Sequence, residues 1–166
     1  MNVSEPCLDL SGSAGLLVDT NLLVLFVVGR VNRRRIETFK RTRRYEPKDY
    51  DLLLRVLQGF KPVYTVAHVL AEVSNLTDLP GPEQDKARCV LKEMISVLNE
   101  TEMPSARAAE DRLYQRLGLV DAAIGAVARA YHCAVLTDDL DLYPQLSRDQ
   151  VCVLNFTHLR ARSFGF

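Results

Sequence analysis

Two short apolar runs that end in acidic residues constrain the fold of this 166-residue chain more than any other feature. The run Gly15–Val18 is followed by Asp19, and the run Cys133–Thr137 is followed by Asp138 and Asp139. Neither run alternates apolar with polar residues, a pattern typical of strands buried on both faces of a parallel sheet. Ligands of α/β proteins bind beyond the carboxyl ends of such strands, so these acids are expected at a functional edge.

Helical spacing of apolar residues fills the chain between these runs. A helix is expected to open near Leu22, and others over Tyr50–Phe60, Val66–Leu76, Glu83–Leu98, Ser105–Leu117, Asp121–Tyr131 and Leu140–Leu146. Val63–Thr65 is a turn or a brief extended piece, and Val151–Leu154 is a last strand before a polar tail. This alternation predicts a three-layer α/β/α fold with a central, mainly parallel sheet, as one domain over residues 1–166.

Composition points to an ordinary globular domain, with 48% apolar residues and 21 basic against 21 acidic side chains. The four cysteines, at positions 7, 89, 133 and 152, form no CxxC pair, so we expect free thiols in a reducing cytoplasm. The apolar stretch 14–28 is interrupted by Asp19, Thr20 and Asn21, and the first residues lack the basic start of a secretory signal. A soluble cytoplasmic protein without a membrane segment is therefore expected.

Charge is distributed unevenly along the chain. Between residues 30 and 44, eight basic side chains are opposed in the sequence only by Glu37, a net charge of +7 in a chain whose formal total is zero. Such a run attracts a polyanion by releasing its counterions. A solvated helix face is the ordinary alternative.

Four acids from separate segments are the candidates for chemistry: Asp19, Glu72, Asp121 and Asp139. Each alone has an ordinary explanation as a helix cap, a partner of a helix dipole or an exposed helical acid. Brought together, they would repel one another unless a cation were present. Carboxylate oxygens favour Mg²⁺ or Mn²⁺, which can activate a water and neutralise charge developing on a phosphodiester. That chemistry is typical of nucleases.

The segments that carry these acids resemble the PIN domain family, and the VapC-type toxin ribonucleases in particular. The resemblance covers about residues 15–156 and lies in Leu17–Asn21, Val69–Val73, Val120–Ala128 and Val135–Leu142. It implies a Mg²⁺- or Mn²⁺-dependent endoribonuclease in which a metal-activated water attacks the scissile phosphate and leaves 5′-phosphate and 3′-hydroxyl ends.

Carried over position by position, the resemblance also implies roles for individual residues. It assigns Asp19, Glu72, Asp121 and Asp139 as catalytic metal ligands, Asp141 as an extra ligand, and Asn21 and Thr137 as supporting polar groups. Which of Asp138, Asp139 and Asp141 is the fourth ligand stays open. Asp19 and Glu72 are 53 positions apart, which suggests that residues 30–45 are a basic insertion. The side chains expected to contact RNA are Arg33, Arg34, Arg35, Arg41, Arg43 and Arg44.

The expected partners are RNA, an antitoxin protein and a second copy of the chain in a homodimer. Two alternatives remain at this point. The chain could be a PIN-like RNA-binding or scaffold module that keeps the acids without cutting, or a receiver-like domain in which Asp19 accepts a phosphoryl group. Roles as a toxin, a defence effector or an RNA-processing enzyme would all show the same site.

Overall fold

The computed structural model describes residues 13–165, in which five strands form one all-parallel sheet of order β3-β2-β1-β4-β5. The strands are β1 (Leu16–Val18), β2 (Val63–Thr65), β3 (Asn99–Glu100), β4 (Ala134–Thr137) and β5 (Val153–Asn155). The central strands β1 and β4 are buried along their whole length, as their unbroken apolar runs predicted. The predicted α/β class with a parallel sheet is confirmed, and the two-residue strand β3 is an addition.

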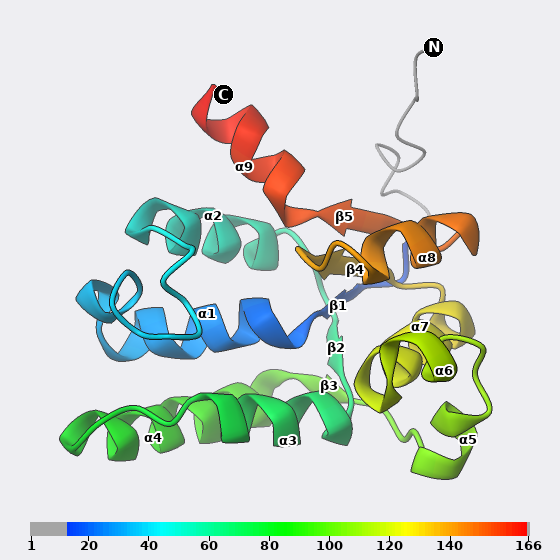
Figure 1. Cartoon of the computed structure of the whole chain (residues 1–166), viewed down its shortest axis with the longest axis horizontal. Helices are drawn as coiled ribbons and strands as arrows, with labels where there is room; N and C mark the ends of the chain where they lie inside the picture. Colours follow the sequence, from blue (N-terminus) through cyan, green and yellow to red (C-terminus); the bar gives the residue numbers. More distant parts are fainter. Residues whose placement is uncertain (1–12, 166) are drawn as a thin grey trace.

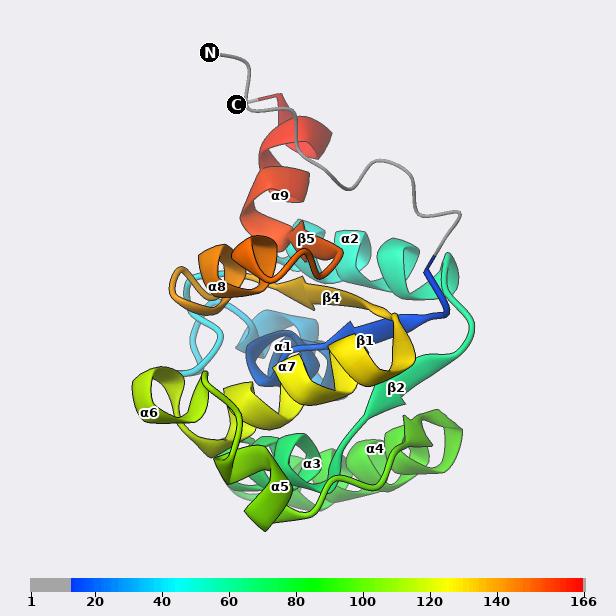
Figure 2. The same ribbon diagram turned by 90° about the vertical axis from the view of Figure 1, so that its right-hand side faces the viewer.

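Helices cover both faces of the sheet, with α1 and α7 on opposite sides of β1 and β4 (Figures 1 and 2). The α-helices are α1 (Thr20–Val31), α2 (Pro47–Gln58), α3 (Ala67–Leu76), α4 (Pro82–Val97), α5 (Ser105–Ala109), α6 (Tyr114–Leu117), α7 (Leu119–Tyr131), α8 (Leu142–Arg148) and α9 (Phe156–Phe164). Across residues 13–165, none of the helices combines the length and apolar character needed to cross a bilayer.

Helix α1 packs against α2, α3 and α4 and is buried around most of its circumference. A helix that is apolar on nearly all sides belongs in a core. Gly29 allows α2 to approach closely, since a Cβ at this position would lie 2.4 Å from the ring of the buried Tyr50. The close approach at Gly29 fixes the last turns of α1 against α2.

Small side chains on α7 let this helix pack closely against the elements around it. Ala122, Ala123 and Ala128 are buried, and a Cβ on Gly125 would lie 2.5 Å from Leu113. The helix predicted over Asp121–Tyr131 is confirmed, with two residues added at its start. Helix α7 also contacts α3, α5, α6 and the central strand β4.

Two expectations about helices are wrong. The single helix expected over Ser105–Leu117 is divided into α5 and α6, because the Asp111 carboxylate accepts the backbone N–H of Leu113 at 2.9 Å and turns the chain there. The polar tail expected after the last strand is the helix α9. Asn155 caps it by accepting the backbone N–H of His158 at 3.1 Å, and Phe156 at its start is fully buried.

The prediction of free thiols is confirmed for Cys89 and Cys133 and is wrong for Cys152, which is disulfide-bonded. Cys7 lies outside the described residues. The cysteines therefore no longer support a reducing compartment, and a cytoplasmic location stays a prediction.

We predict that Gly29→Ala lowers the free energy of unfolding by about 1–2 kcal/mol, because overpacking against Tyr50 outweighs the gain in helix propensity. Chemical denaturation followed by circular dichroism measures the change. Val97→Ala, at a side chain that is 75% exposed, is the control and should change stability by less than about 0.5 kcal/mol. A Gly29→Ala protein as stable as the wild type would contradict the packing described.

Candidate metal centre

Asp19 occupies the junction between β1 and α1 but does not use its side chain as a helix cap. It is 4% exposed, and its Oδ2 accepts a hydrogen bond from Thr137 Oγ1 at 2.7 Å. Burial raises the pKa of Asp19 from 3.8 to about 7; the Thr137 hydrogen bond opposes this shift, and the charges of Asp138 and Asp139 add to it. Capping therefore does not explain this acid.

Asp121 lies in the first turn of α7, where the charges of four other carboxylates act on it. Burial is the largest cause that raises its pKa from 3.8 to about 7. The further causes are the negative charges of Asp19, Asp139, Glu72 and Asp141. The fold thus brings the acids singled out in the sequence into one electrostatic environment.

Glu72 on α3 approaches the start of α1 despite the 53 positions between it and Asp19. Its Oε2 accepts a hydrogen bond from Thr20 Oγ1 at 2.6 Å, and Thr20 is the residue after Asp19. This role of Thr20 was not predicted from the sequence. The available signal was a polar residue beside an acid at a strand end.

Asp139 is linked to Asp19 through a single hydroxyl. Thr137 Oγ1 accepts the backbone N–H of Asp139 at 3.0 Å while it donates to Asp19. Asp139 Oδ1 accepts the N–H groups of Asp141 and Leu142 at 2.7 and 2.8 Å. The ordinary interpretation of Asp139 as a cap therefore accounts for one of its two carboxylate oxygens.

Asp138 is engaged elsewhere, although it is the neighbour of Asp139. Its side chain is buried and accepts hydrogen bonds from the Tyr45 hydroxyl and from Arg44 Nη2, the latter at 3.1 Å. Of the remaining predicted residues, Asn21 is half-buried in the first turn of α1, and Asp141 is exposed.

The donor set has the chemistry of a magnesium or manganese site without the close grouping of one. Within residues 13–165, no group of three or more His, Cys, Asp or Glu side chains is arranged to hold a metal ion. Asp19, Glu72 and Asp139 are each hydrogen-bonded to a protein donor instead. All the candidate donors are carboxylate oxygens, which are the ligands that hard divalent cations prefer. The residues present therefore fit the ion chemically.

The positive charge of the basic segment, residues 30–45, is partly neutralised in the fold by acids from other parts of the chain. Four of its cations form ion pairs, namely Arg33 with Asp51 at 2.5 Å, Arg35 with Glu83 at 2.5 Å, Lys40 with Asp78 at 2.9 Å, and Arg44 with Asp138 at 3.0 Å. Glu37 is the only acid within this part of the sequence, but acids from other parts of the chain approach it in the fold. Arg34, Arg41 and Arg43 are exposed and form no side-chain ion pair within the described part of the chain.

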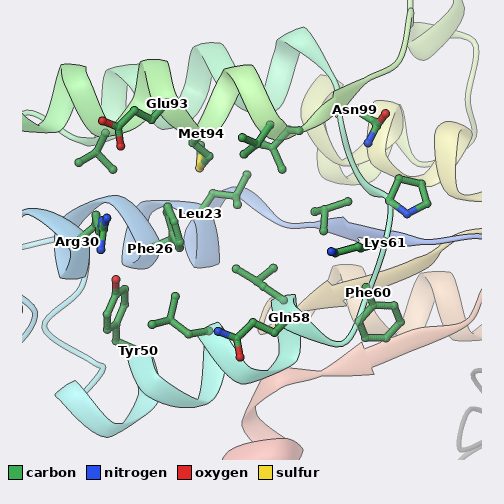
Figure 3. Close-up of a pocket in the computed structure, with 17 residues that line it drawn as sticks. Leu23, Phe26, Arg30, Tyr50, Gln58, Phe60, Lys61, Glu93, Met94 and Asn99 are labelled. Carbon is green, nitrogen blue, oxygen red and sulfur yellow. The ribbon is translucent and has the colours of Figure 1, made fainter.

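An apolar groove lies between α1, α2 and α4, away from these acids (Figure 3). Its volume is about 970 Å³, and its lining includes Leu23, Phe26, Tyr50 and Met94. None of the candidate metal ligands lines it. The groove and the acidic site are separate features of the molecule.

Asp19 and Asp139 follow β1 and β4 of the parallel sheet, and Glu72 and Asp121 approach them from α3 and α7. The family model for the PIN domain matches residues 16–144, and the chain belongs to this family of nucleases. PIN domains typically use divalent metal ions. No curated protein matched the sequence. The family is thus the one predicted, and the narrower likeness to VapC-type toxins stays a prediction.

The raised pKa values of Asp19 and Asp121 predict that the metal-free protein loses stability as pH rises from about 4 to about 7. In that window the folded state holds protons that the unfolded state has released, so unfolding becomes easier as pH rises. Asp121→Asn should flatten this dependence and stabilise the protein in EDTA at pH 7.5 by about 1 kcal/mol, or roughly 3 °C in Tm.

Thermal unfolding across this pH range measures the effect, with the exposed Glu102→Gln as the matched control. Identical pH profiles for wild type and Asp121→Asn would contradict the electrostatic crowding described.

Proposed function

We propose that this PIN domain is a metal-dependent endoribonuclease. The observation that carries the proposal is the convergence of the acids: Thr137 Oγ1 joins Asp19 to Asp139, and Thr20, the residue after Asp19, donates to Glu72. The charges of these acids also add to the burial that raises the pKa of Asp121. Crowded carboxylates cost stability, and a divalent cation would offset that cost. The family match supports the same chemistry.

In this proposal Asp19, Glu72, Asp121 and Asp139 hold Mg²⁺ or Mn²⁺, and Asp141 contributes an outer carboxylate. Asp139 is favoured over Asp138 because Tyr45 and Arg44 already engage the Asp138 carboxylate. When bound, the ion supplies an activated water and neutralises negative charge on the scissile phosphate.

The protein's own groups orient these acids. Thr137 fixes one oxygen of Asp19 and also receives the Asp139 N–H, so one hydroxyl sets the spacing of two carboxylates. Thr20 fixes one oxygen of Glu72 by donating its hydroxyl proton to it. Asn21 is proposed to support Asp19 from the first turn of α1.

We predict that the full chain cuts single-stranded RNA in Mg²⁺ or Mn²⁺ and leaves 5′-phosphate and 3′-hydroxyl ends. Asp121→Asn should reduce the rate more than about 100-fold, because removing a ligand loses several kcal/mol of charge stabilisation. The cleavage rate is measured from the loss of intact RNA over time, and sequencing of the cut ends identifies the end groups. EDTA and Glu102→Gln are the controls. Cyclic-phosphate ends would contradict the mechanism. RNA binding without metal-dependent cutting would favour the alternative, a non-cleaving RNA-binding or scaffold module.

Thr137→Val tests the orientation of the acids. It removes the donor to Asp19 and the acceptor for the Asp139 N–H, so metal affinity should fall about 10- to 100-fold, as for other groups that orient ligands. Calorimetric titration with Mn²⁺ measures the affinity. Unchanged affinity would remove Thr137 from the proposed site.

The narrower proposal adds partners and a biological role. Exposed Arg34, Arg41 and Arg43 of the basic segment contact RNA, whereas Arg33 and Arg35 are already paired with acids. As a cytoplasmic toxin of a toxin–antitoxin pair, the chain would bind an antitoxin and form a homodimer. Its apolar groove is a surface that a protein partner could cover (Figure 3).

A further inference from the structure

We infer that Arg44 binds a phosphate of the RNA strand beside the acidic site and that Asp138 positions its guanidinium for this contact. The inference rests on the proposed function and deepens it, because it selects from the basic segment the cation that acts at the reaction centre. Asp138 becomes a positioning residue in place of a metal ligand.

Arg44 is attached to the acidic site by two neighbouring side chains. Its Nη2 donates to Asp138 Oδ1 at 3.1 Å and to the Tyr45 hydroxyl at 2.9 Å, and its guanidinium carbon lies 5.0 Å from the centre of the Tyr45 ring. Asp138 directly precedes Asp139. In Figure 2 the loop between α1 and α2 lies on the side of the sheet where β4 ends.

The anchor for Arg44 is buried and fixed in place. Tyr45 is 1% exposed, donates its hydroxyl proton to Asp138, and packs edge-on against Phe156 of α9 with ring centres 6.4 Å apart. Burial raises the pKa of the Tyr45 hydroxyl well above its ordinary value, with Asp138 adding to the shift, so this group remains a donor. A guanidinium held on such a platform has lost much of its conformational freedom before any ligand arrives.

Arg44 keeps hydrogen-bonding capacity for a ligand. Its side chain is 51% exposed, whereas the side chain of Asp138 is 5% exposed. Within residues 13–165 the contacts of the guanidinium use Nη2, so Nε and Nη1 remain as donors. A guanidinium presents these donors in a planar fork that suits phosphate oxygens.

The position of Arg44 distinguishes it from the other paired cations of the basic segment. Arg33 and Lys40 pair with Asp51 and Asp78, which are not among the site acids. Asp19, in contrast, contributes to the electrostatic environment of Arg44: partial burial works to lower the pKa of Arg44, and Tyr45, Asp138 and Asp19 together raise it. An RNA phosphate bound at the acids would therefore come within the field of this guanidinium.

The test compares Asp138→Asn with the double variant Arg44→Ala/Asp138→Asn. Both lack the buried Asp138 charge, so neither leaves an unpaired carboxylate, and they differ only at position 44. Each is combined with Asp121→Asn to prevent cutting. Binding of a fluorescein-labelled, mixed-sequence single-stranded RNA is measured by anisotropy in Mg²⁺ over a range of salt concentrations, with thermal unfolding of each protein alongside.

We expect loss of Arg44 to weaken RNA binding about tenfold, as for a lost hydrogen bond to a charged group, and to reduce the slope of log affinity against log salt by about 0.7. Lys40→Ala, which removes another paired cation of the basic segment, should change neither value. Equal affinity and equal slope for the two variants would overturn the role of Arg44, as would an equal loss caused by Lys40→Ala. Asp138→Asn should itself bind RNA more weakly than the protein with Asp138 intact, and equal affinity of these two proteins would overturn the positioning role of Asp138.

Failure of the proposed function gives a different result. In that case the wild-type chain would not cut RNA in Mg²⁺ or Mn²⁺, while the binding comparison would still report on Arg44.

Discussion

Repulsion among the carboxylates near the ends of β1 and β4 explains how the side chains around them are arranged. The register pairs Val18 with Leu136, and the Asp19 N–H donates to the Leu136 carbonyl at 3.0 Å. The hydrogen bonds of the sheet therefore place Asp19 beside Thr137 in spite of the electrostatic repulsion from the acids that follow β4. Buried carboxylates in this position are held partly protonated near neutral pH, which is an unfavourable arrangement unless a cation is bound.

Neighbouring side chains stabilise these carboxylates in two ways, by hydrogen bonds and by an ion pair. Hydroxyls fix the orientation of the carboxylates that remain near one another, Thr137 for Asp19 and Thr20 for Glu72. The buried carboxylate of Asp138, which does not take part in these contacts, is neutralised by its ion pair with Arg44. The basic segment thus serves partly as counter-charge within the protein, because four of its eight cations pair with acids and the others remain for a polyanion.

The central strands and the acids at their ends could be predicted because burial and chain direction are local properties of the sequence. The approach of Glu72 to Thr20, and of Arg44 to Asp138, could not, since each joins segments more than 50 positions apart through side chains that have many alternative partners. The break between α5 and α6 depends on the Asp111 carboxylate accepting a backbone N–H, which competes with helical continuation. Helix α9 could have been predicted, because Asn155 is a residue type favoured at helix N-caps and it accepts the His158 N–H.

Calorimetric titration of the full chain with Mn²⁺ at pH 6, in buffers of different ionisation enthalpy, tests most directly whether these carboxylates share a divalent ion. We predict binding accompanied by proton release, because Asp19 and Asp121 have pKa values of about 7 and must lose their protons to become ligands. The Asp121→Asn protein should bind more weakly and release fewer protons. Absence of Mn²⁺ binding, or binding that is identical in Asp121→Asn, would contradict the shared metal centre.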